Sequence, residues 1–218
     1  MKIYIEDSFS FFEEIRKVFK FSVEFSPYVF KDPYFLAYIR VRNPNKREFY
    51  EPFPIEVENE KKGLINGVIY DGVELLKYFS RDVDTSEPTV LITNRLIATF
   101  GEDGRYHLRM IVMGPAAIIS LKGILYAPAK SPQYYMKHSF GFNEKINVNV
   151  GKVLKMLLLQ FYAYFKHEEI FCENEECMLH NCHTTEEIEK VKGLCEKHRK
   201  MLGDVVNLRG LYGMCEKE

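Results

Sequence analysis

The chain has 218 residues, of which 46% are hydrophobic and 28% charged, and its formal net charge is −1. This length suits one large domain or two small ones with a sizeable core, and the lack of a basic excess argues against a nucleic-acid-binding protein. No run approaches the roughly 20 apolar residues of a membrane span, and the beginning, Met1–Asp7, turns acidic without the apolar stretch of a secretory signal, so we expect a soluble cytoplasmic protein without a membrane partner.

The first third of the chain combines clear apolar patterns with a proline-rich stretch. Residues 1–6 alternate apolar and polar as a strand does, and Ser10 with Glu13 resembles a capping box that opens a helix ending near Phe19. Residues 26–62 carry many prolines and charges, which predicts an irregular, exposed segment containing one short strand. The other predicted elements here are a strand at Phe21–Phe25, the short strand at Leu36–Val41 and a helix at Gly67–Phe79.

Further along the chain, short strands precede one long helix. Thr89–Thr93 is an apolar run that predicts a buried strand, and Gly101–Gly104 predicts a turn. The alternation of strands and helices predicts a layered α+β (α/β-like) domain with a mixed sheet. The remaining predicted elements are strands at His107–Met113 and Ala116–Leu121, a loop over residues 122–145, a helix at Val148–Lys166 and a helix beginning at the Thr184–Glu187 capping box.

The C-terminal quarter carries the pattern Cys172-x4-Cys177-x17-Cys195-x2-His198. Thiolates and a neutral imidazole satisfy tetrahedral Zn²⁺, and two close pairs separated by a longer stretch are the usual layout of a structural site. Clustered cysteines in a reducing compartment favour a metal over disulfides. Four protein ligands leave no position for water, so we expect one structural zinc ion that contributes to folding. Three residues of the same stretch could each replace a ligand: His180, Cys182 and His183.

The run Phe171–Asn181, followed by Cys195-Glu-Lys-His198, resembles the archaemetzincins, which are zinc peptidases with a minimal metzincin-like fold. Their pattern is H-E-x-x-H-x-x-G-x-x-H-C-x4-C-x-M and then C-x-x-C, so His198 stands where that family has cysteine. Gly123–Lys130 and Asn181–Glu187 resemble more closely an archaeal family labelled as metallopeptidases. The resemblance implies a single zincin-like domain, with a core over residues 1–170 and a zinc-binding segment over 171–218 packed on it.

The same resemblance implies that the catalytic half of the motif is substituted. Counting back from Cys172, the positions of the three histidines hold Phe161, Phe165 and Phe171. The position of the glutamate holds Tyr162, and that of the turn glycine holds Glu168. Phenylalanine has no lone pair for a metal, so a second zinc ion cannot bind there in the standard way. The resemblance also implies that Ala116–Leu121 is the edge strand that takes an extended peptide. The abundance of Lys and Glu with only two Gln, together with the resemblance, indicates a thermophilic archaeal source.

Three functions remain open at this point. The first is a catalytically inactive peptidase relative, a pseudoenzyme, that binds a peptide or protein. The second is an active zinc hydrolase with other ligands, such as His183 with Glu186, His138 or His167. The third is a zinc-stabilised interaction module without a cleft. A polar group of His183, Glu186 and Glu187 could act as a base or only cap a helix. The candidate cleft residues are Ile118, Ser120, Tyr126, Lys130, Phe161 and Phe165.

Overall fold

The computed structural model describes residues 1–6, 10–126 and 149–212. Its strands are β1 (Lys2–Ile5), β2 (Glu24–Pro27), β3 (Ile69–Asp71), β4 (Thr89–Thr93), β5 (Leu96–Phe100), β6 (Tyr106–Arg109), β7 (Ile111–Met113) and β8 (Ala117–Ser120). Its helices are α1 (Phe12–Arg16), α2 (Pro33–Tyr38), α3 (Pro54–Lys61), α4 (Gly72–Asp82), α5 (Leu121–Tyr126), α7 (Val150–His167), α8 (Thr185–Lys190), α9 (Glu196–Leu202) and α10 (Leu208–Tyr212). None of the helices in these described ranges is long and apolar enough to cross a membrane.

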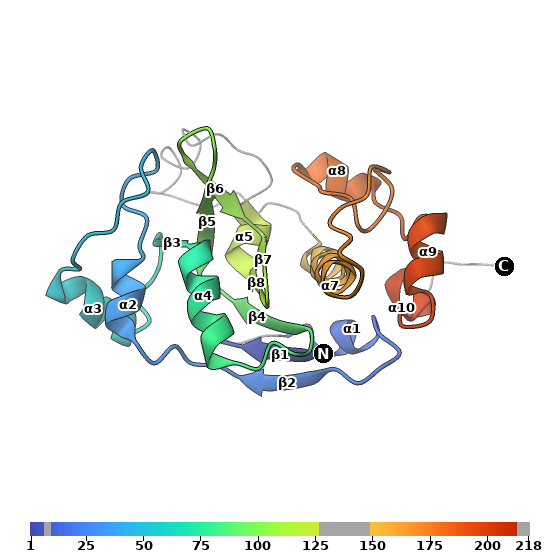
Figure 1. The fold of residues 1–218 in the computed structure, drawn as a ribbon, viewed down its shortest axis with the longest axis horizontal. Coiled ribbons are helices and arrows are strands. Elements are labelled where there is room, and N and C mark those ends of the chain that lie inside the picture. Colours follow the sequence, from blue (N-terminus) through green and yellow to red (C-terminus); the bar gives the residue numbers. More distant parts are fainter. Residues whose placement is uncertain (7–9, 127–148, 213–218) are drawn as a thin grey trace.

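The centre of the fold is a five-stranded mixed sheet in the order β2-β1-β4-β8-β7, as the prediction of a mixed α/β architecture requires. Strands β2, β1, β4 and β8 are parallel, and β7 pairs antiparallel with β8. A second sheet, β3-β5-β6, has three strands. Figure 1 shows α2 and α3 at one end of the molecule, α8 to α10 at the other, and the central sheet and α7 between them.

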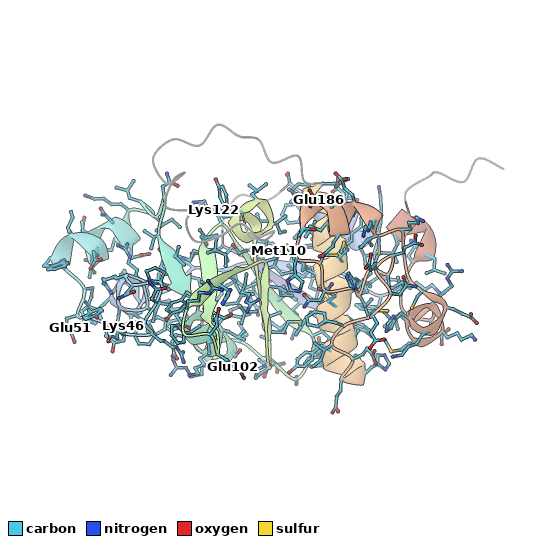
Figure 2. All side chains as sticks on the ribbon, turned by 90° about the horizontal axis from the view of Figure 1, so that it is seen from above. Lys46, Glu51, Glu102, Met110, Lys122 and Glu186 are labelled. Carbon is cyan, nitrogen blue, oxygen red and sulfur yellow. The ribbon has the colours of Figure 1, made fainter. Side chains whose placement is uncertain are left out.

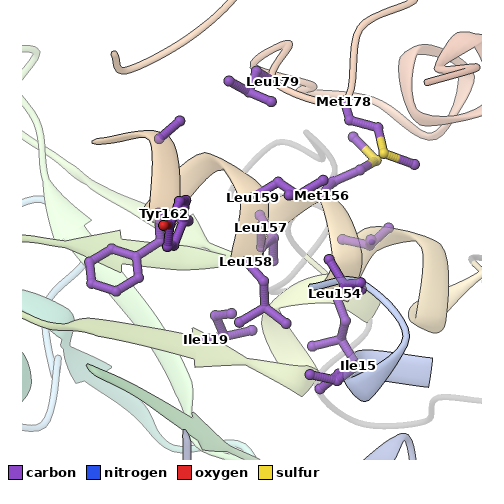
Figure 3. Close-up of a cluster of buried hydrophobic side chains, with 14 of the residues drawn as sticks. Ile15, Ile119, Leu154, Met156, Leu157, Leu158, Leu159, Tyr162, Met178 and Leu179 are labelled. Atoms are coloured by element: carbon purple, nitrogen blue, oxygen red, sulfur yellow. The ribbon is translucent and has the colours of Figure 1, made fainter. Parts of the chain in front are cut away.

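The two faces of the central sheet pack into separate apolar clusters. Because successive strand residues point to opposite faces, Val90 and Ile92 join the cluster formed with α7, whereas Leu91 joins the cluster formed with α4. Figure 3 shows the first cluster, in which Leu154 and Leu158 of α7 approach side chains of the sheet and of α1. The same cluster contains Met178 and Leu179, so the C-terminal segment shares the core of the sheet and α7.

The identity of the edge strand differs from the sequence prediction. We expected Ala116–Leu121 to be the edge, but β8 lies between β4 and β7 and is hydrogen-bonded on both sides. A strand paired on both sides offers no free edge to a peptide, so that prediction was wrong. The edge on this side of the sheet is β7, with β2 at the opposite edge, and the predicted single strand His107–Met113 is divided between β6 of one sheet and β7 of the other.

The proline-rich segment contains helices rather than the predicted strand at Leu36–Val41. Asp32 caps α2 by accepting a hydrogen bond from the amide of Phe35, and Pro33 occupies the first turn, where its missing N–H costs nothing. Pro54 starts α3 in the same way, and the Glu56 side chain accepts from the amide of Phe53. We call residues 28–66, which contain both helices, the arm. The capping residues of these two helices therefore indicated the local structure better than the apolar run at Leu36–Val41, from which the strand was predicted.

Several element boundaries also differ from prediction. The predicted helix Gly67–Phe79 is a strand, β3, followed by α4, because the Asp71 carboxylate caps the helix at the amides of Val73 and Glu74. Helix α1 begins at Phe12 with Phe11 as its cap residue, so the expected capping box at Ser10 does not form. Strand β5 was not predicted. The predicted loop 122–145 begins with helix α5, and its part after Tyr126 lies outside the described residues.

The arm is attached to the sheet through a buried network of charges. Glu60, whose side chain is fully buried, accepts hydrogen bonds from Arg40, from the Tyr70 hydroxyl at 2.7 Å and from Arg95 at 2.8 Å. Arg95 follows β4 and also pairs with Glu6, which follows β1. Every charge in this network has a partner of opposite sign, as burial requires. Figure 2 shows Lys46 and Glu51 of the arm at one end and Glu186 of α8 toward the other.

Candidate metal centre

Four side chains converge beyond the end of α7. Cys172, Cys177, Cys195 and His198 place their ligand atoms within 4.8 Å of one another. The Sγ atoms of Cys172 and Cys195 are 3.9 Å apart, and His198 Nδ1 lies 3.1 Å from Cys195 Sγ and 3.4 Å from Cys177 Sγ. A tetrahedral site with Zn–S bonds of about 2.3 Å separates its sulfur atoms by about 3.8 Å. The spacing therefore fits a tetrahedral zinc ion.

Local backbone structure brings these four side chains together. Cys172 donates its amide to the carbonyl of Leu179, and Cys177 forms a bridge with Gly193, so two short turns carry the first pair. Cys195 is the N-cap residue of α9 and His198 follows three positions later, which puts both side chains on one side of the first helical turn. The buried apolar neighbours Met178, Leu179 and Leu194 anchor the turns to the core.

Burial and helix geometry act in opposite directions on the thiols. Burial raises the pKa of Cys177 to about 12 and raises the pKa of Cys172. Burial also opposes ionisation of Cys195, but hydrogen bonds from the backbone of His198 and from neighbouring thiols lower its pKa overall. A divalent cation at the centre favours the thiolate form of all three, so metal binding releases protons at neutral pH.

The alternative ligands lie outside this cluster. His180 directs Nδ1 to the carbonyl of Cys172 at 2.9 Å, Cys182 is buried elsewhere in the core with a pKa raised to about 11 by burial, and His183 is exposed. In the ranges that the structure describes, the four residues above form the one group of three or more His, Cys, Asp or Glu side chains that could hold a metal. The zinc assignment itself stays a prediction.

The predicted capping box at the start of α8 is present. Thr184 accepts a hydrogen bond from the amide of Glu187, and the Glu187 carboxylate accepts from the amides of His183 and Thr184. Glu186 is exposed and accepts from the Thr185 hydroxyl. The Glu187 carboxylate therefore serves the helix terminus, and the structure supports the capping interpretation of this polar group.

The predicted cleft is only partly compatible with the structure. Ile118, Ser120 and Phe161 are fully buried, so they line no cleft, and that part of the prediction was wrong. Ser120 has a structural role, since its hydroxyl donates to the carbonyl of Arg95 and accepts from the amide of Gly123. Phe165 and Tyr126 are half-buried. His167 is exposed at the end of α7, whereas Lys130 and His138 lie outside the described residues.

Aromatic side chains occupy the catalytic register of the resemblance. The rings of Phe161 and Phe165, one helical turn apart, lie 5.9 Å from each other, and Tyr162 stacks on Phe21. Glu168, at the position of the turn glycine, has a φ of 55° in the left-handed region that glycine adopts most easily. The chain therefore makes a left-handed turn directly after α7.

The edge strand β7 contributes side chains to both apolar clusters. Ile111 and Met113 pack against the cluster formed with α7, and Val112 packs against the other face. The amide of Ser120 bonds the carbonyl of Met110 and the amide of Gly114 bonds the carbonyl of Ala116, so even-numbered residues face β8. The polar backbone groups of Ile111 and Met113 thus point outward, and no described residue pairs with them. The sequence prediction joined this strand to β6 in one strand, His107–Met113, because the apolar pattern continues across Met110 between them.

The chain belongs to the family described as "Probable metallopeptidase family (DUF6775)", whose sequence model matches residues 2–150 and 141–205. No curated protein matches the chain.

Two solved structures are similar to this chain over most of their length. One is an archaemetzincin from Methanopyrus kandleri, with 10% sequence identity and a TM-score of 0.49 over 94% of each chain. The other is a zinc-dependent peptidase from Methanocorpusculum labreanum, with 12% identity and a TM-score of 0.49 over 92% of this chain and 98% of the other.

Proposed function

We propose that this chain is a non-hydrolytic member of its family that binds an extended peptide along β7 and is stabilised by one structural zinc ion. The observation that carries the proposal is that aromatic residues of α7 and two residues of β7 belong to the same apolar cluster. Helix α7 presents Phe161, Tyr162 and Phe165 where a peptidase needs ligands and a base, while β7 keeps an outward backbone edge.

The aromatic substitutions argue against hydrolysis by the family's chemistry. Metal-assisted peptide hydrolysis needs an ion that polarises the carbonyl and activates water, together with a carboxylate base. Phe161 and Phe165 offer no lone pairs, and Phe161 is completely buried among apolar side chains. The described residues provide no second group of ligands besides the cysteine–histidine cluster.

The edge strand supports peptide binding by strand addition. An extended peptide placed beside β7 would pair with the outward amides and carbonyls of Ile111 and Met113 and add a sixth strand to the central sheet. Main-chain hydrogen bonds supply affinity in this mode, and alternate peptide side chains contact the protein. Binding of this kind needs no residue that hydrolysis would need, so it survives the loss of the ligands.

The test combines metal content, activity and binding. We expect one zinc per chain in freshly purified protein, no cleavage of a random-sequence peptide library, and selection of binders from the same library. In a selected peptide, N-methylation should abolish binding at alternate positions only, because every second amide faces β7. Two zinc ions per chain together with measurable cleavage would overturn the proposal. So would a selected peptide whose binding is lost on N-methylation at positions that do not alternate along its sequence.

A further inference from the structure

One carboxylate outside the candidate ligand set contacts the imidazole of the cluster. Glu169 Oε1 lies 3.4 Å from His198 Nε2 and 2.7 Å from Lys197 Nζ. His198 is fully buried, and its other ring nitrogen, Nδ1, faces the thiols of Cys177 and Cys195. Glu169 therefore reaches the side of the ring opposite to the proposed metal.

The chemistry of imidazole assigns a role to this contact. A neutral histidine that binds a metal through Nδ1 carries its proton on Nε2, which then needs a hydrogen-bond acceptor. A buried donor left without an acceptor costs about 1–3 kcal/mol. Within the described part of the chain, Glu169 supplies the acceptor for His198 Nε2.

The backbone explains how Glu169 reaches this position. Helix α7 ends at His167, and the left-handed conformation of Glu168 turns the chain sharply, so Glu169 begins the segment that leads to Cys172 three residues later. The carboxylate thus comes from the end of the core helix, whereas His198 comes from the first turn of α9. Their contact links His198, and through it the cluster, to the end of the core helix.

We propose that Glu169 is a positioning residue of the metal cluster: its carboxylate accepts the Nε2 proton of His198, holds the ring with Nδ1 toward the thiols and strengthens metal binding. This inference rests on the zinc ion of the proposed function. Outer carboxylates of this kind typically change metal affinity by roughly 10- to 100-fold when removed. The competing explanation is that Glu169 only forms a surface ion pair with Lys197, which is largely exposed and would contribute little.

A matched pair of variants separates the two explanations. Glu175 pairs with Lys190 at 2.9 Å in the same segment, so Glu175→Ala removes a carboxylate and a lysine ion pair without touching a histidine. Zinc affinity is measured by chelator competition. We expect Glu169→Ala to weaken zinc binding by roughly 10-fold or more, and Glu175→Ala to leave it within about twofold of wild type. Equal affinities for both variants and wild type, with zinc bound, would overturn the inference alone; wild-type protein without zinc would overturn the proposed function itself.

A nuclear magnetic resonance measurement keeps the test independent of stability. In the zinc-bound wild type, the His198 ring should show the Nε2–H tautomer with a proton protected from exchange, and Glu169→Ala should lose that protection. A double-mutant cycle with His198→Cys adds the strictest comparison, because the effect of Glu169→Ala on metal affinity should vanish when no imidazole is present. An Nδ1–H tautomer in the wild type, or an unchanged effect in the His198→Cys background, contradicts the role given to Glu169.

Discussion

The arm and the C-terminal segment lie at opposite ends of the molecule (Figure 1), and each contains residues of one polar cluster. The ion pairs centred on Glu60 connect the arm to Arg95 after β4, whereas the three thiols and the imidazole of the other cluster all lie within the C-terminal segment. The first cluster is complete within the polypeptide, because its positive and negative charges neutralise each other. The second would be completed by the proposed zinc ion, which would bind ligand atoms that lie within 4.8 Å of one another.

Because of this difference, the stability of each region should depend on a different factor. A group that binds only the folded state stabilises it in proportion to the logarithm of its free concentration, so under the proposed function the stability of the C-terminal segment would depend on the supply of metal. The arm depends on the charge state and geometry of residues that are always present. The charge network also buries its carboxylate completely, whereas Cys172 and Cys195 of the cluster are only half-buried and accessible to an incoming ion.

Loss of the metal should produce the largest effect. Cys172→Ser removes one ligand, and we expect the variant to lose its zinc and the order of residues 171–205, because structural zinc sites contribute roughly 10 kcal/mol or more to folding in small zinc modules. Metal analysis, thermal unfolding and amide exchange would record the change. Chelation of the wild type should reproduce it.

The control for this change is Cys182→Ala. Cys182 is a buried cysteine outside the cluster, so its substitution should cost some packing energy but leave one zinc per chain. If Cys172→Ser retained its metal, or if Cys182→Ala lost it, the assignment of the four ligands would fail. In both variants the amides of the arm should keep their native protection from hydrogen exchange, so that only the C-terminal segment responds to loss of the metal.

The charge network should give an intermediate effect. Glu60→Ala leaves the guanidinium groups of Arg40 and Arg95 and the hydroxyl of Tyr70 without their shared acceptor. Breaking a buried ion pair on one side typically costs about 3–5 kcal/mol, so we expect that loss of unfolding free energy in urea, with zinc content unchanged. Glu58→Ala, which removes an exposed ion pair with Lys62 on the same helix, should cost less than about 0.5 kcal/mol. Similar losses in both variants would contradict the central position of Glu60.

The smallest expected effect is a pH dependence within the arm. Burial opposes ionisation of Glu56, but hydrogen bonds from Arg42 and from the amide of Phe53 outweigh it and lower the pKa of the Glu56 carboxyl. A lowered pKa in the folded state stabilises the protein above the unfolded value, about 4.3, and this stabilisation disappears as the pH falls through the folded value. The stability difference between wild type and Glu56→Gln should therefore be present at pH 7, on the order of 1 kcal/mol or less, and shrink below about pH 4. A difference that is constant from pH 7 to pH 3 would show that the charge of Glu56 has no part in it.

Elements with a strong local signal were predictable from the sequence. Thr89–Thr93 is β4 with the predicted bounds, and the Thr184–Glu187 capping box is present. Helix α7 begins two residues after its predicted start, because Asn149 caps it, and ends one residue after its predicted end. The spacing of the cysteines and His198 identified the one ligand group found among the described residues, since coordination geometry restricts the residue types and intervals.

The sequence by itself therefore determined properties that depend on one helix turn, one strand or one pair of ligands. These are helix α7, the cap of α8 and the residues of the cysteine–histidine cluster. Only the tertiary structure decided which strand forms the edge of the sheet, which polar side chains meet Glu60, and that Glu169 reaches His198 from 29 residues away. These features depend on the order of strands and on contacts between distant segments. Local periodicity predicts neither, because an apolar strand has the same sequence pattern at the centre of a sheet and at its edge.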